Sequence, residues 1–598
     1  MPRKPHILPG NKNTETPNNC IWVDTETKPK RGIDNRDYHY LWFGWACHQR
    51  TRNTNEWTKP DWLYFRKRNQ FWDWAISKAR PRTRLYIFAH NWGFDGPVLD
   101  LFRILPEQGW ELTGAVADAP PLILTYKKDR MTIKIVDTLN IWRTSLDEIG
   151  KSIGLRKLKM PDYKSSQKRW DAYGRRDVKV IQRACLAWFK FLRDNDLGSF
   201  QMTLASQSFT AFRHRFMPAK IFIDNDEETL GIARDSYVGG RTDCFRIGKY
   251  TGEFYYIDVN SMYPSVMRKN KYPIKLVGHY RNIDDREVNE WLKDDCMVVQ
   301  CTVETDEPIY PVVRDGRLIF PVGRFDITLA TPEFKYAWEH NHVVSIDTVT
   351  LYESAELFTD FIDTLYNLRL EAKHKGDALN THLYKILMNS LYGKFGQRGR
   401  KFKDIGPYDP EVIEVWRDYD ADTKTWTDYR AFGGLLQEWV EEGESYNSFP
   451  AIASHVTSYA RMVLWEAIKS AGVDNCYYCD TDSLVVNAEG YKLLSRLINP
   501  DQIGKWTLER TLSRLELYGP KDYVFDDTRR TKGVRASADW LSQSTVEQDA
   551  FVGLKGLLRS GSLDAPIVHK IQKTLKREYL KGVVNSDGTV SPFRLWEE

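Results

Sequence analysis

The alternation of apolar and polar positions divides the first third of the chain into strands and one long helix. Apolar residues recur at helical spacing from Asp171 to Arg193, and the polar run DNDLGS follows. Strands that alternate with helices are typical of an α/β domain, which we expect over residues 21–198. Residues 1–20 are rich in polar residues and proline and are predicted to be a disordered tail. The strand-like runs are IWVDTETK from Ile21, RLYIFAHN from Arg84 and MTIKIVDTL from Met131.

Two apolar strands later in the chain carry acids where a buried strand avoids charge. EFYYI is followed directly by Asp258 and a turn into a helical pattern, and YYCDTDSLVV contains Asp480 and Asp482. A buried, uncompensated carboxylate costs several kcal/mol, and two neighbouring ones repel each other. Mg²⁺ ions held between Asp258 and Asp482, with Asp480 nearby, would remove that cost. The alternative for Asp258 is a helix N-cap.

The segment YKILMNSLYGKFG lies between these acids and is predicted to be helical up to Gly393. Lys385, Asn389 and Tyr392 fall at i, i+4 and i+7 and therefore share one face. A lysine, an amide and a tyrosine on one face suit a triphosphate and a base pair. The alternative is a solvated stripe of an amphipathic helix.

A second set of acids lies in the N-terminal α/β domain. Asp24 and Glu26 are two apart on a predicted strand, so both side chains point to one face. Asp95 follows another strand in HNWGFD, while Tyr173 and Asp177 are four apart on the long helix. Acids from three segments can hold the two metal ions that phosphodiester hydrolysis needs, with Tyr173 orienting the water. Each motif alone also fits an ordinary strand end, loop or amphipathic helix.

Composition narrows the class of protein. The chain has 598 residues, of which 42% are hydrophobic and 28% charged, and this length predicts at least three domains. A net charge of +5 is too small to attract a polyanion globally, so nucleic acid would have to bind in local clefts. No apolar run approaches the roughly 20 residues of a membrane helix, and no signal peptide is evident, which predicts a cytoplasmic protein. The eight cysteines, Cys476 and Cys479 among them, are expected to be buried hydrophobic residues.

The motifs, taken in order, resemble those of a known family. DVNSMYPS, KILMNSLYGKFG and YCDTDS resemble the polymerase motifs of family B DNA polymerases, and DTET, HNWGFD and YGRRD resemble the proofreading exonuclease motifs of that family. YVGG, from Tyr237 to Gly240, resembles the linker motif of the protein-primed branch, the small Bacillus-phage type. The resemblance implies an α/β and α+β multidomain fold, with an RNase H-like exonuclease domain followed by a right-hand palm, fingers and thumb.

The same resemblance implies an order of domains. Both proposed insertions are rich in charge, and the second is also rich in tryptophan. The expected units are a tail (1–20), a 3′–5′ exonuclease domain (21–198), the first part of the palm (199–267), insertion 1 or terminal-protein region 1 (268–358), the fingers (359–396), insertion 2 or terminal-protein region 2 (397–450), the second part of the palm (451–540) and the thumb (541–598).

The resemblance also assigns roles at a polymerase site. Asp258, Asp480 and Asp482 would be catalytic, and the metal ligands would be Asp258, Val259 and Asp482. Tyr263 would exclude ribonucleotides, although Tyr263 and Tyr392 also fit as core aromatics. The residues expected to bind nucleotide are Ser261, Met262, Tyr263, Arg369, Lys385, Asn389 and Tyr392. The residues expected to contact DNA are Tyr237, Gly239, Gly240, Thr457, Arg461, Lys521, Tyr523 and Lys532.

At the exonuclease site, the resemblance implies that the metal ligands are Asp24, Glu26, Asp95 and Asp177. Tyr173 and a lysine that precedes it would complete the catalytic set. RKLKMPDY offers Lys157 and Lys159, and we predict Lys159. The residues expected to hold the frayed single strand are Thr27, His90, Asn91, Phe94, Thr138 and Leu139.

The implied protein is a DNA-directed DNA polymerase with a proofreading exonuclease, which replicates a linear viral or plasmid genome by protein priming and strand displacement. Its cofactors would be Mg²⁺ or Mn²⁺, two ions per site. Its expected partners are the DNA template and primer strand, deoxynucleoside triphosphates, a separate terminal protein and a single-strand DNA-binding protein, with no membrane. We expect a monomer in the cytoplasm of the host cell. The alternatives are a family B polymerase that uses nucleic-acid primers and a non-catalytic single-strand-binding protein descended from a polymerase.

Overall fold

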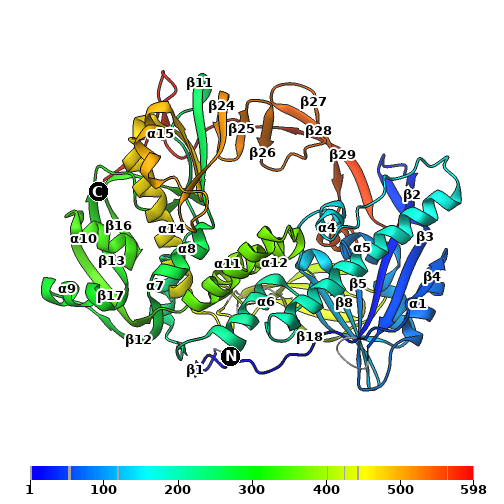
Figure 1. Ribbon diagram of the computed structural model, residues 1–598. Helices are drawn as coiled ribbons and strands as arrows, with labels where there is room; N and C mark the ends of the chain where they lie inside the picture. Colours follow the sequence, from blue (N-terminus) through cyan, green and yellow to red (C-terminus); the bar gives the residue numbers. More distant parts are fainter. Residues whose placement is uncertain are drawn as a thin grey trace.

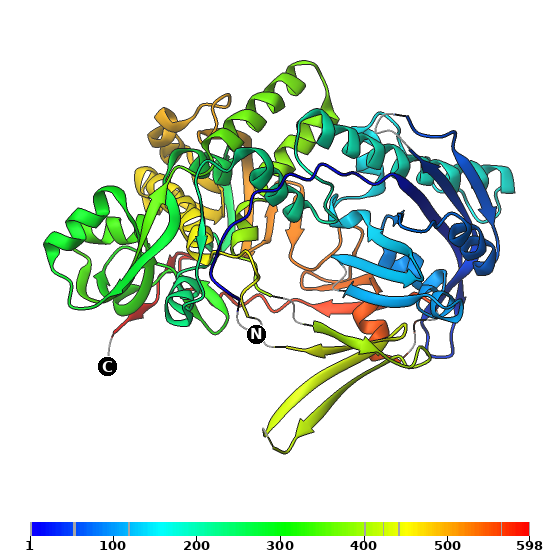
Figure 2. The ribbon, with the colours of Figure 1, turned by 90° about the horizontal axis from the view of Figure 1, so that it is seen from below.

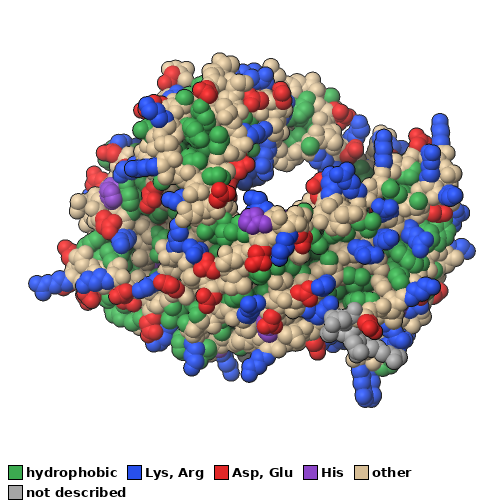
Figure 3. Space-filling model, in the orientation of Figure 1, with side chains coloured by type: hydrophobic (Ala, Val, Ile, Leu, Met, Phe, Trp, Pro, Cys, Tyr) green, Lys and Arg blue, Asp and Glu red, His purple; other side chains and the backbone are tan. Residues whose placement is uncertain are grey.

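The computed structural model describes residues 3–51, 56–117, 120–399, 402–422, 424–440, 443–561, 563 and 565–596. Its elements surround a central opening, with the N-terminal α/β unit on one side and the strands near Asp258 on the other (Figures 1 and 3). All eight cysteines are free and buried, as expected. Among the described residues, no helix is long and apolar enough to cross a membrane.

The N-terminal unit is built on a 10-stranded sheet. Nine strands follow the order β27-β28-β29-β3-β2-β5-β8-β7-β6, and β4 (Asp61–Phe65) pairs with β3 outside this path. The last two strands of the order are β7 (Leu122–Lys128) and β6 (Glu111–Ala117). Its central strands are β2 (Asn19–Arg31), β3 (Asp37–Arg50), β5 (Arg84–Ala89) and β8 (Met131–Asp137). β5 is parallel to both β2 and β8, and α5 (Gln167–Asp194) packs against β2 and β3. The strands and the long helix predicted from the apolar pattern are therefore confirmed.

The predicted disordered tail is wrong for the residues that the structure describes, 3–20. β1 (His6–Ile7) pairs with β9 (Phe222–Ile223), and Leu8 is 1% exposed. The backbone carbonyl of Glu15 accepts a hydrogen bond from the Phe200 amide. The segment crosses from the central part of the molecule to the N-terminal unit (Figure 2). Burial of Leu8 and strand pairing offset the polar composition that predicted disorder. Residues 1–2 lie outside the described part.

A 7-stranded sheet with the order β10-β22-β23-β11-β24-β25-β26 forms the other side of the opening. Helix α14 (Pro450–Ala471) packs against β23, and α8 (Met262–Lys269) follows β11 directly. The sheet brings together strands that are more than two hundred residues apart in sequence: β10 (Thr242–Cys244), β11 (Gly248–Val259), β22 (Cys476–Asp480), β23 (Ser483–Asn487), β24 (Trp506–Gly519), β25 (Asp522–Phe525) and β26 (Thr528–Thr531).

Two further sheets lie within the ranges expected for the insertions. The first has the order β12-β17-β13-β16-β32, and its first four strands are β12 (Tyr272–Tyr280), β13 (Cys296–Thr305), β16 (Val322–Ala330) and β17 (Val343–Ala355). The second has four strands, β18 (Phe402–Pro407), β19 (Glu414–Asp420), β20 (Thr425–Phe432) and β21 (Leu435–Trp439). The β19–β20 hairpin projects from the body of the molecule (Figure 2).

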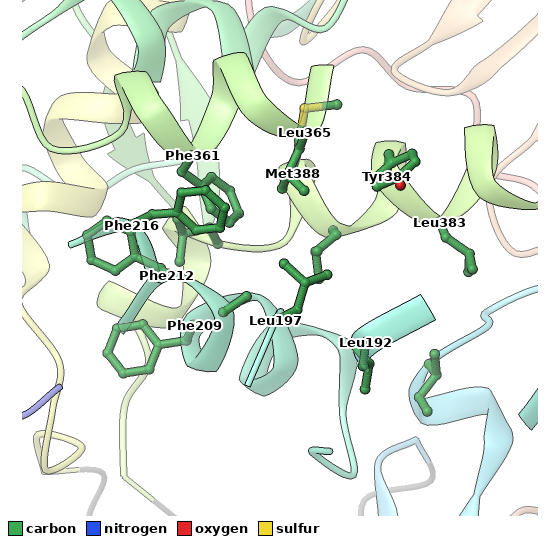
Figure 4. Packing of buried hydrophobic residues seen from close by; sticks show 14 of the residues in the cluster. Leu192, Leu197, Phe209, Phe212, Phe216, Phe361, Leu365, Leu383, Tyr384 and Met388 are labelled. Atoms are coloured by element: carbon green, nitrogen blue, oxygen red, sulfur yellow. The ribbon is translucent and has the colours of Figure 1, made fainter. Parts of the chain in front are cut away.

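Helices α11 (Thr359–His374) and α12 (Ala378–Asn389) join the two sides through an apolar cluster shown in Figure 4. Phe361 and Met388 pack there with Leu192 in the last turn of α5, with Leu197 just after that helix, and with Phe209 of α6 (Leu204–Ala211). The helix predicted up to Gly393 is instead interrupted. α12 ends at Asn389, where the Ser390 hydroxyl donates to the Ile386 carbonyl at 2.6 Å, and α13 (Tyr392–Phe395) follows.

The expected thumb, 541–598, is divided between three parts of the molecule. β27 (Asp539–Trp540), β28 (Thr545–Phe551) and β29 (Ile567–Thr574) extend the N-terminal sheet, because β29 pairs with β3. The chain then returns to the 7-stranded sheet, where the Tyr579 hydroxyl accepts the Cys244 amide at 3.1 Å. Its last strand, β32 (Arg594–Leu595), pairs with β16. Strand pairing along this path encloses the opening (Figure 1).

Candidate active sites

The first group of acids, here called the N-terminal carboxylate site, comprises Asp24, Glu26, Asp95 and Asp177. Asp24 and Glu26 lie on the same face of β2, and α5 supplies Asp177. One carboxylate oxygen from each of these three residues lies within 4.8 Å of the other two. Oxygen ligands at this spacing fit a hard divalent cation such as Mg²⁺.

Asp95 lies beside these three acids, on α2 (Trp92–Val98), but points to the backbone of β2. Its Oδ1 accepts the Thr25 amide at 3.1 Å and the Thr25 hydroxyl at 2.6 Å. The residue is 3% exposed, and burial raises its pKa to about 7 despite those hydrogen bonds. Asp95 therefore holds β2 in place at Thr25, between Asp24 and Glu26. Its carboxyl group can also face an ion.

Charge repulsion at the N-terminal carboxylate site is only partly compensated. Burial, followed by the charge of Asp177, raises the pKa of Asp24 well above its usual range and that of Glu26 to about 8. Among the described residues, Oδ1 of Asp177 is buried without a hydrogen-bond partner. A buried carboxylate oxygen without a partner, next to carboxyl groups whose pKa values are raised, indicates that positive charge is missing. A metal ion bound here would supply that charge.

The structure places Lys157, and not the predicted Lys159, at these acids. Lys157 Nζ donates to Asp177 Oδ2 and lies 4.8 Å from the centre of the Tyr173 ring. Although burial opposes it, the charges of Asp177 and Asp24 hold the pKa of Lys157 above its usual range. Lys159 is exposed. The sequence could not decide between them because both lie in a segment without regular structure before α5.

The predicted strand-binding residues lie next to the N-terminal carboxylate site, but several are already engaged. His90 binds the Thr138 hydroxyl through Nδ1 at 2.8 Å and the Thr144 carbonyl through Nε2 at 2.9 Å, and burial lowers its pKa to about 4. The Thr27 hydroxyl binds His39 Nδ1 at 2.9 Å. The Phe94 ring lies 5.9 Å from the Phe551 ring of β28. His90 and Thr138 thus shape the loop, whereas Phe94 reaches the C-terminal strands.

Sequence reasoning missed Asp137, the residue that holds this loop. Its carboxylate accepts the backbone amides of Asn91 at 2.9 Å, Trp92 at 2.8 Å and Leu139 at 2.9 Å. Burial nevertheless raises its pKa to about 6. These bonds fix Asn91, whose φ of +87° is left-handed, at the start of α2. The signal in the sequence that could have identified Asp137 was an acid at the end of a buried strand.

The second group of acids, here called the central carboxylate site, comprises Asp258, Asp480 and Asp482. Asp258, the second-last residue of β11, lies directly opposite Ser483 of β23, and the Val259 amide donates to the Asp482 carbonyl at 2.8 Å. Burial, followed by the charge of Asp482, raises the pKa of Asp258 to about 7, and burial also raises the pKa of Asp482. The predicted approach of the two acids across a sheet is therefore confirmed.

Asp480 lies at the same turn but has hydrogen-bond and ion-pair partners of its own. Its Oδ1 accepts the Thr242 hydroxyl at 3.0 Å and pairs with Lys521 Nζ at 3.3 Å. Thr481 adopts a left-handed φ of +65°, and its amide donates to the Arg241 carbonyl at 2.7 Å. The turn between the two acids is thus fixed by Arg241 and Thr242, at the start of β10. Asp480 has an ion pair, whereas Asp482 has none within the described part of the chain.

The YVGG segment contacts this turn directly. A Cβ added at Gly240 would lie 2.9 Å from Thr481 Cγ2 and 3.1 Å from the Tyr263 hydroxyl. A Cβ at Gly239 would meet nothing within 4 Å. Gly240 is therefore required for close packing against the carboxylate turn, whereas Gly239 is not. Tyr237 packs against Gly396, after α13.

Two of the predicted DNA contacts, Arg461 and Thr457, are buried in α14. Arg461 is 3% exposed, forms a bidentate ion pair with Glu333 at 2.7 and 2.9 Å, and donates to the carbonyls of Val238 and Gly239 at 2.9 Å. Thr457 is 2% exposed, and its hydroxyl donates to the Ser454 carbonyl at 3.1 Å. As direct DNA ligands both predictions are wrong in this structure; Arg461 instead anchors the YVGG segment.

The predicted nucleotide-binding residues gather around the central carboxylate site. The Tyr263 and Tyr392 rings stack with their centres 4.7 Å apart, and Arg369 donates to the Ser261 hydroxyl at 3.1 Å. Lys385 and Asn389 are exposed on α12, and the charge of Lys385 lowers the pKa of both Asp258 and Asp482. Met262 is buried at the start of α8.

The last predicted DNA contacts lie beyond Asp480. Lys521 and the exposed Lys532 line one side of a basic groove of about 390 Å³, together with Arg529, Arg530 and Arg535. Tyr523 is 8% exposed and stacks on Phe525, with ring centres 4.0 Å apart. The lysines are placed to meet a phosphate backbone, whereas Tyr523 is mainly a packing residue.

Comparisons with known proteins agree with this geometry. A match to the family described as DNA polymerase type B, organellar and viral, covers residues 156–406. The DNA-directed DNA polymerase of Enterobacteria phage PRD1 is 28% identical over 303 residues, which are 49% of this chain and 49% of the relative. The DNA polymerase of Bacillus phage phi29 is 24% identical over 379 residues, 59% of each protein. The chain thus spans about half to three fifths of these relatives.

Solved structures show the same fold. The phi29 DNA polymerase complexed with primer-template DNA and incoming nucleotide substrates matches with a TM-score of 0.66 and 18% identity, over 94% of this chain and all of that one. By its motifs, its family match over residues 156–406 and its fold, the chain is similar to the type B DNA polymerases of the organellar and viral group.

Proposed function

We propose that the protein is a DNA-directed DNA polymerase whose central carboxylate site extends a primer and whose N-terminal carboxylate site removes nucleotides from its 3′ end. The observation that carries the proposal is the presence of two separate groups of buried or half-buried acids, one on each side of the central opening. The names of the relatives, and a neighbouring structure with primer-template DNA and nucleotides, support the same activity.

For extension, Asp258 and Asp482 would hold Mg²⁺ or Mn²⁺, with two ions at each site as the proposed number. When bound, such ions neutralise phosphate charge and stabilise the attacking and leaving oxygens of the displacement. Lys385 and Arg369 would grip the triphosphate, and the stacked Tyr263 and Tyr392 would form a wall of the nucleotide pocket. The primer hydroxyl would then be aligned with the α-phosphate, so that positioning supplies much of the rate.

For hydrolysis, Asp24, Glu26, Asp95 and Asp177 would hold the ions that activate water. Lys157, fixed by Asp177 and stacked near Tyr173, would stabilise negative charge that develops on the phosphate. The Tyr173 hydroxyl would orient the attacking water. Asn91 and Phe94, at the start of α2, and Leu139, which follows β8, lie next to this site and would hold the unpaired primer end.

We also propose protein priming on a linear viral or plasmid genome, with strand displacement, in the cytoplasm of a host cell. A separate terminal protein would supply the first hydroxyl, and a single-strand DNA-binding protein would coat the displaced strand. The proposal is supported by YVGG packed on the carboxylate turn and by the sheets at 272–355 and 402–439. The alternative is priming by ordinary nucleic acid; isolation of genome ends joined to protein would decide, and bare 5′ ends would contradict protein priming.

A primer-extension assay with separate site variants tests the two activities. Asp482→Ala should abolish nucleotide incorporation and leave Mg²⁺-dependent degradation of the primer. Asp24→Ala with Glu26→Ala should do the opposite. If either variant, while folded, lost both activities, the assignment of one reaction to each site would be wrong.

A further inference from the structure

A basic groove runs along α5 on the outside of the N-terminal unit. It has a volume of about 1050 Å³ and is bounded on the side facing α5 by Trp57, Pro60 and Trp62, of which Trp62 lies on β4 (Asp61–Phe65). Its α5 wall extends from Ala172 to Asp194, which corresponds to roughly 33 Å of helix. Neither carboxylate site contributes to its lining.

The groove uses a different face of α5 from the N-terminal carboxylate site. Tyr173 and Asp177 point to the sheet and are buried. Arg175, Lys179 and Arg183 follow one another at intervals of four residues and are exposed. Because residues four apart lie one above the other on a helix, these three cations form a row with a spacing of about 6 Å.

The charge of this row is largely uncompensated. The groove is lined by six basic side chains, Arg175, Arg176, Lys179, Arg183, Lys190 and Arg193, and by one acid, Asp194, which pairs with Lys190. Among the described residues, Lys179 and Arg183 have no carboxylate within ion-pair distance. Like charges in a row repel one another, which raises the free energy of the protein without a ligand. A bound polyanion would relieve this repulsion.

Two tryptophan rings hold Arg175 in the wall of the groove. The Arg175 guanidinium lies 4.7 Å from the centre of the Trp62 ring and 5.6 Å from that of Trp45. The floor contains Gln182, which is 4% exposed and donates to Gln49. A cation stacked on indole rings loses little side-chain freedom when it binds an anion, which favours recognition of phosphate.

We infer that this groove binds the phosphate backbone of single-stranded DNA. A row of cations at regular spacing fits a repeating polyanion better than a single anion, and arginine with lysine is the usual pair for phosphate. The covered faces of Trp62 and Trp57 leave little room for base stacking, which predicts binding without sequence preference. That the bound strand is DNA rests on the proposed function. The preference of the groove for an anion rests only on its own charge.

Acetylation of surface lysines tests the inference on the unmodified protein. The protein is saturated with oligothymidylate of about 20 nucleotides, in EDTA so that no strand is degraded, and each acetylated lysine is quantified by mass spectrometry. Lys179 should react several-fold more slowly with the oligonucleotide than without it, and high salt should remove the protection. Lys293, exposed on α9 (Asp285–Asp294), is the internal control and should be unaffected. An unchanged rate at Lys179 on saturated protein would overturn the inference.

A pair of neutralised variants measures the contribution to binding. Lys179→Gln with Arg183→Gln should reduce the slope of log Kobs against log salt by about 1.4, because each phosphate contact on a single strand contributes roughly 0.7. Arg286→Gln with Lys293→Gln removes the same charge from exposed positions of α9 and should leave the slope unchanged. Equal slopes for the two variants would contradict the site. Protection by polyglutamate but not by DNA would indicate an acidic protein partner and would also contradict it.

This experiment is independent of catalysis. Primer extension and removal of single nucleotides from a very short oligonucleotide should be unchanged in Lys179→Gln with Arg183→Gln, since neither residue touches a carboxylate site. If the wild-type protein had no polymerase activity, the proposed function would be contradicted. If the variant bound DNA as the wild type does, only the assignment of the groove as a DNA-binding site would be contradicted.

Discussion

The two carboxylate sites solve the same electrostatic problem in different ways. At the N-terminal site, three acids converge within 4.8 Å and a lysine of the same domain, Lys157, is already bonded to one of them. At the central site, Asp258 pairs with Ser483 across two strands, Asp482 lies in the turn directly before Ser483, and Lys385 lies on a separate helix. The third acid there, Asp480, is paired with Lys521.

This difference indicates that the N-terminal site is arranged before substrate arrives, whereas the central site is completed by it. A triphosphate carries negative charge and brings its own metal ion, so a polymerase site needs only part of the ligand set in the protein. A hydrolytic site acts on a phosphodiester with one charge and must supply the remaining ligands itself. Four variants can sharpen or break this comparison.

The largest expected effect concerns the scaffold of the central site. Arg461→Met leaves Glu333, which is 1% exposed, as a buried charge without its partner and releases the carbonyls of Val238 and Gly239. Breaking a buried ion pair costs about 3–5 kcal/mol. Urea unfolding should show that loss, and incorporation should fall more than exonuclease activity. Equal loss of both activities would show that α14 supports the two sites alike.

The next effect separates Lys157 from Lys159. Lys157→Met should lower the exonuclease rate by roughly a hundredfold, because it removes the cation bonded to Asp177. Lys159→Met, two residues away and exposed, is the matched control and should change the rate little. Single-turnover degradation of a labelled strand measures both. A larger loss in Lys159→Met would restore the original prediction from the sequence.

Gly240→Ala should have a smaller effect, restricted to the central site. Its methyl group would lie 2.9 Å from Thr481 Cγ2, so the turn between Asp480 and Asp482 must shift by a few tenths of an ångström. Misplacement of this size should reduce incorporation about tenfold. Gly239→Ala, where nothing lies within 4 Å, should be neutral in the same primer-extension assay. A neutral Gly240→Ala would show that the turn tolerates movement.

The smallest effect is the pH dependence of the metal-free protein. Burial and Asp177 raise the pKa of Glu26 to about 8, so folding takes up a proton there, and stability rises as pH falls from 8 towards the ordinary glutamate range. Glu26→Gln should therefore raise the melting temperature in EDTA at pH 8, and this gain should shrink at pH 6. Calorimetry at the two pH values checks it; a gain independent of pH would exclude Glu26 as the charged group.

The sequence was most informative where chemistry conflicted with burial. Acids inside apolar strands predicted both carboxylate sites, and the apolar period predicted β2, β5, β8 and α5. It was least informative where long-range pairing decides the outcome. Nothing local in residues 3–20 reveals β9 as a partner, and nothing in 541–598 reveals pairing with β3 and β16.

The roles of individual side chains were likewise predictable where chemistry conflicts with burial and not where the partner is distant in sequence. Asp258 and Asp482 were predictable because a carboxylate in a buried strand has few uses other than binding a cation. Arg461 was assigned to DNA because a basic residue near a polymerase motif resembles a phosphate ligand, yet its true partner, Glu333, lies on α10 (Thr331–Glu339) and is distant in sequence. Lys157 and Lys159 could be distinguished only by the path of the chain before α5.

The central claim, that one site is preformed and the other is completed by substrate, can be tested most directly by calorimetric titration of Mn²⁺. In the absence of nucleotide, wild type and Asp258→Asn should bind Mn²⁺ alike, and Asp177→Asn should bind it far more weakly. A second binding event should appear in the Asp177→Asn protein only after primed template and nucleotide are added. Strong binding by Asp177→Asn without nucleotide, lost in Asp258→Asn, would contradict the account.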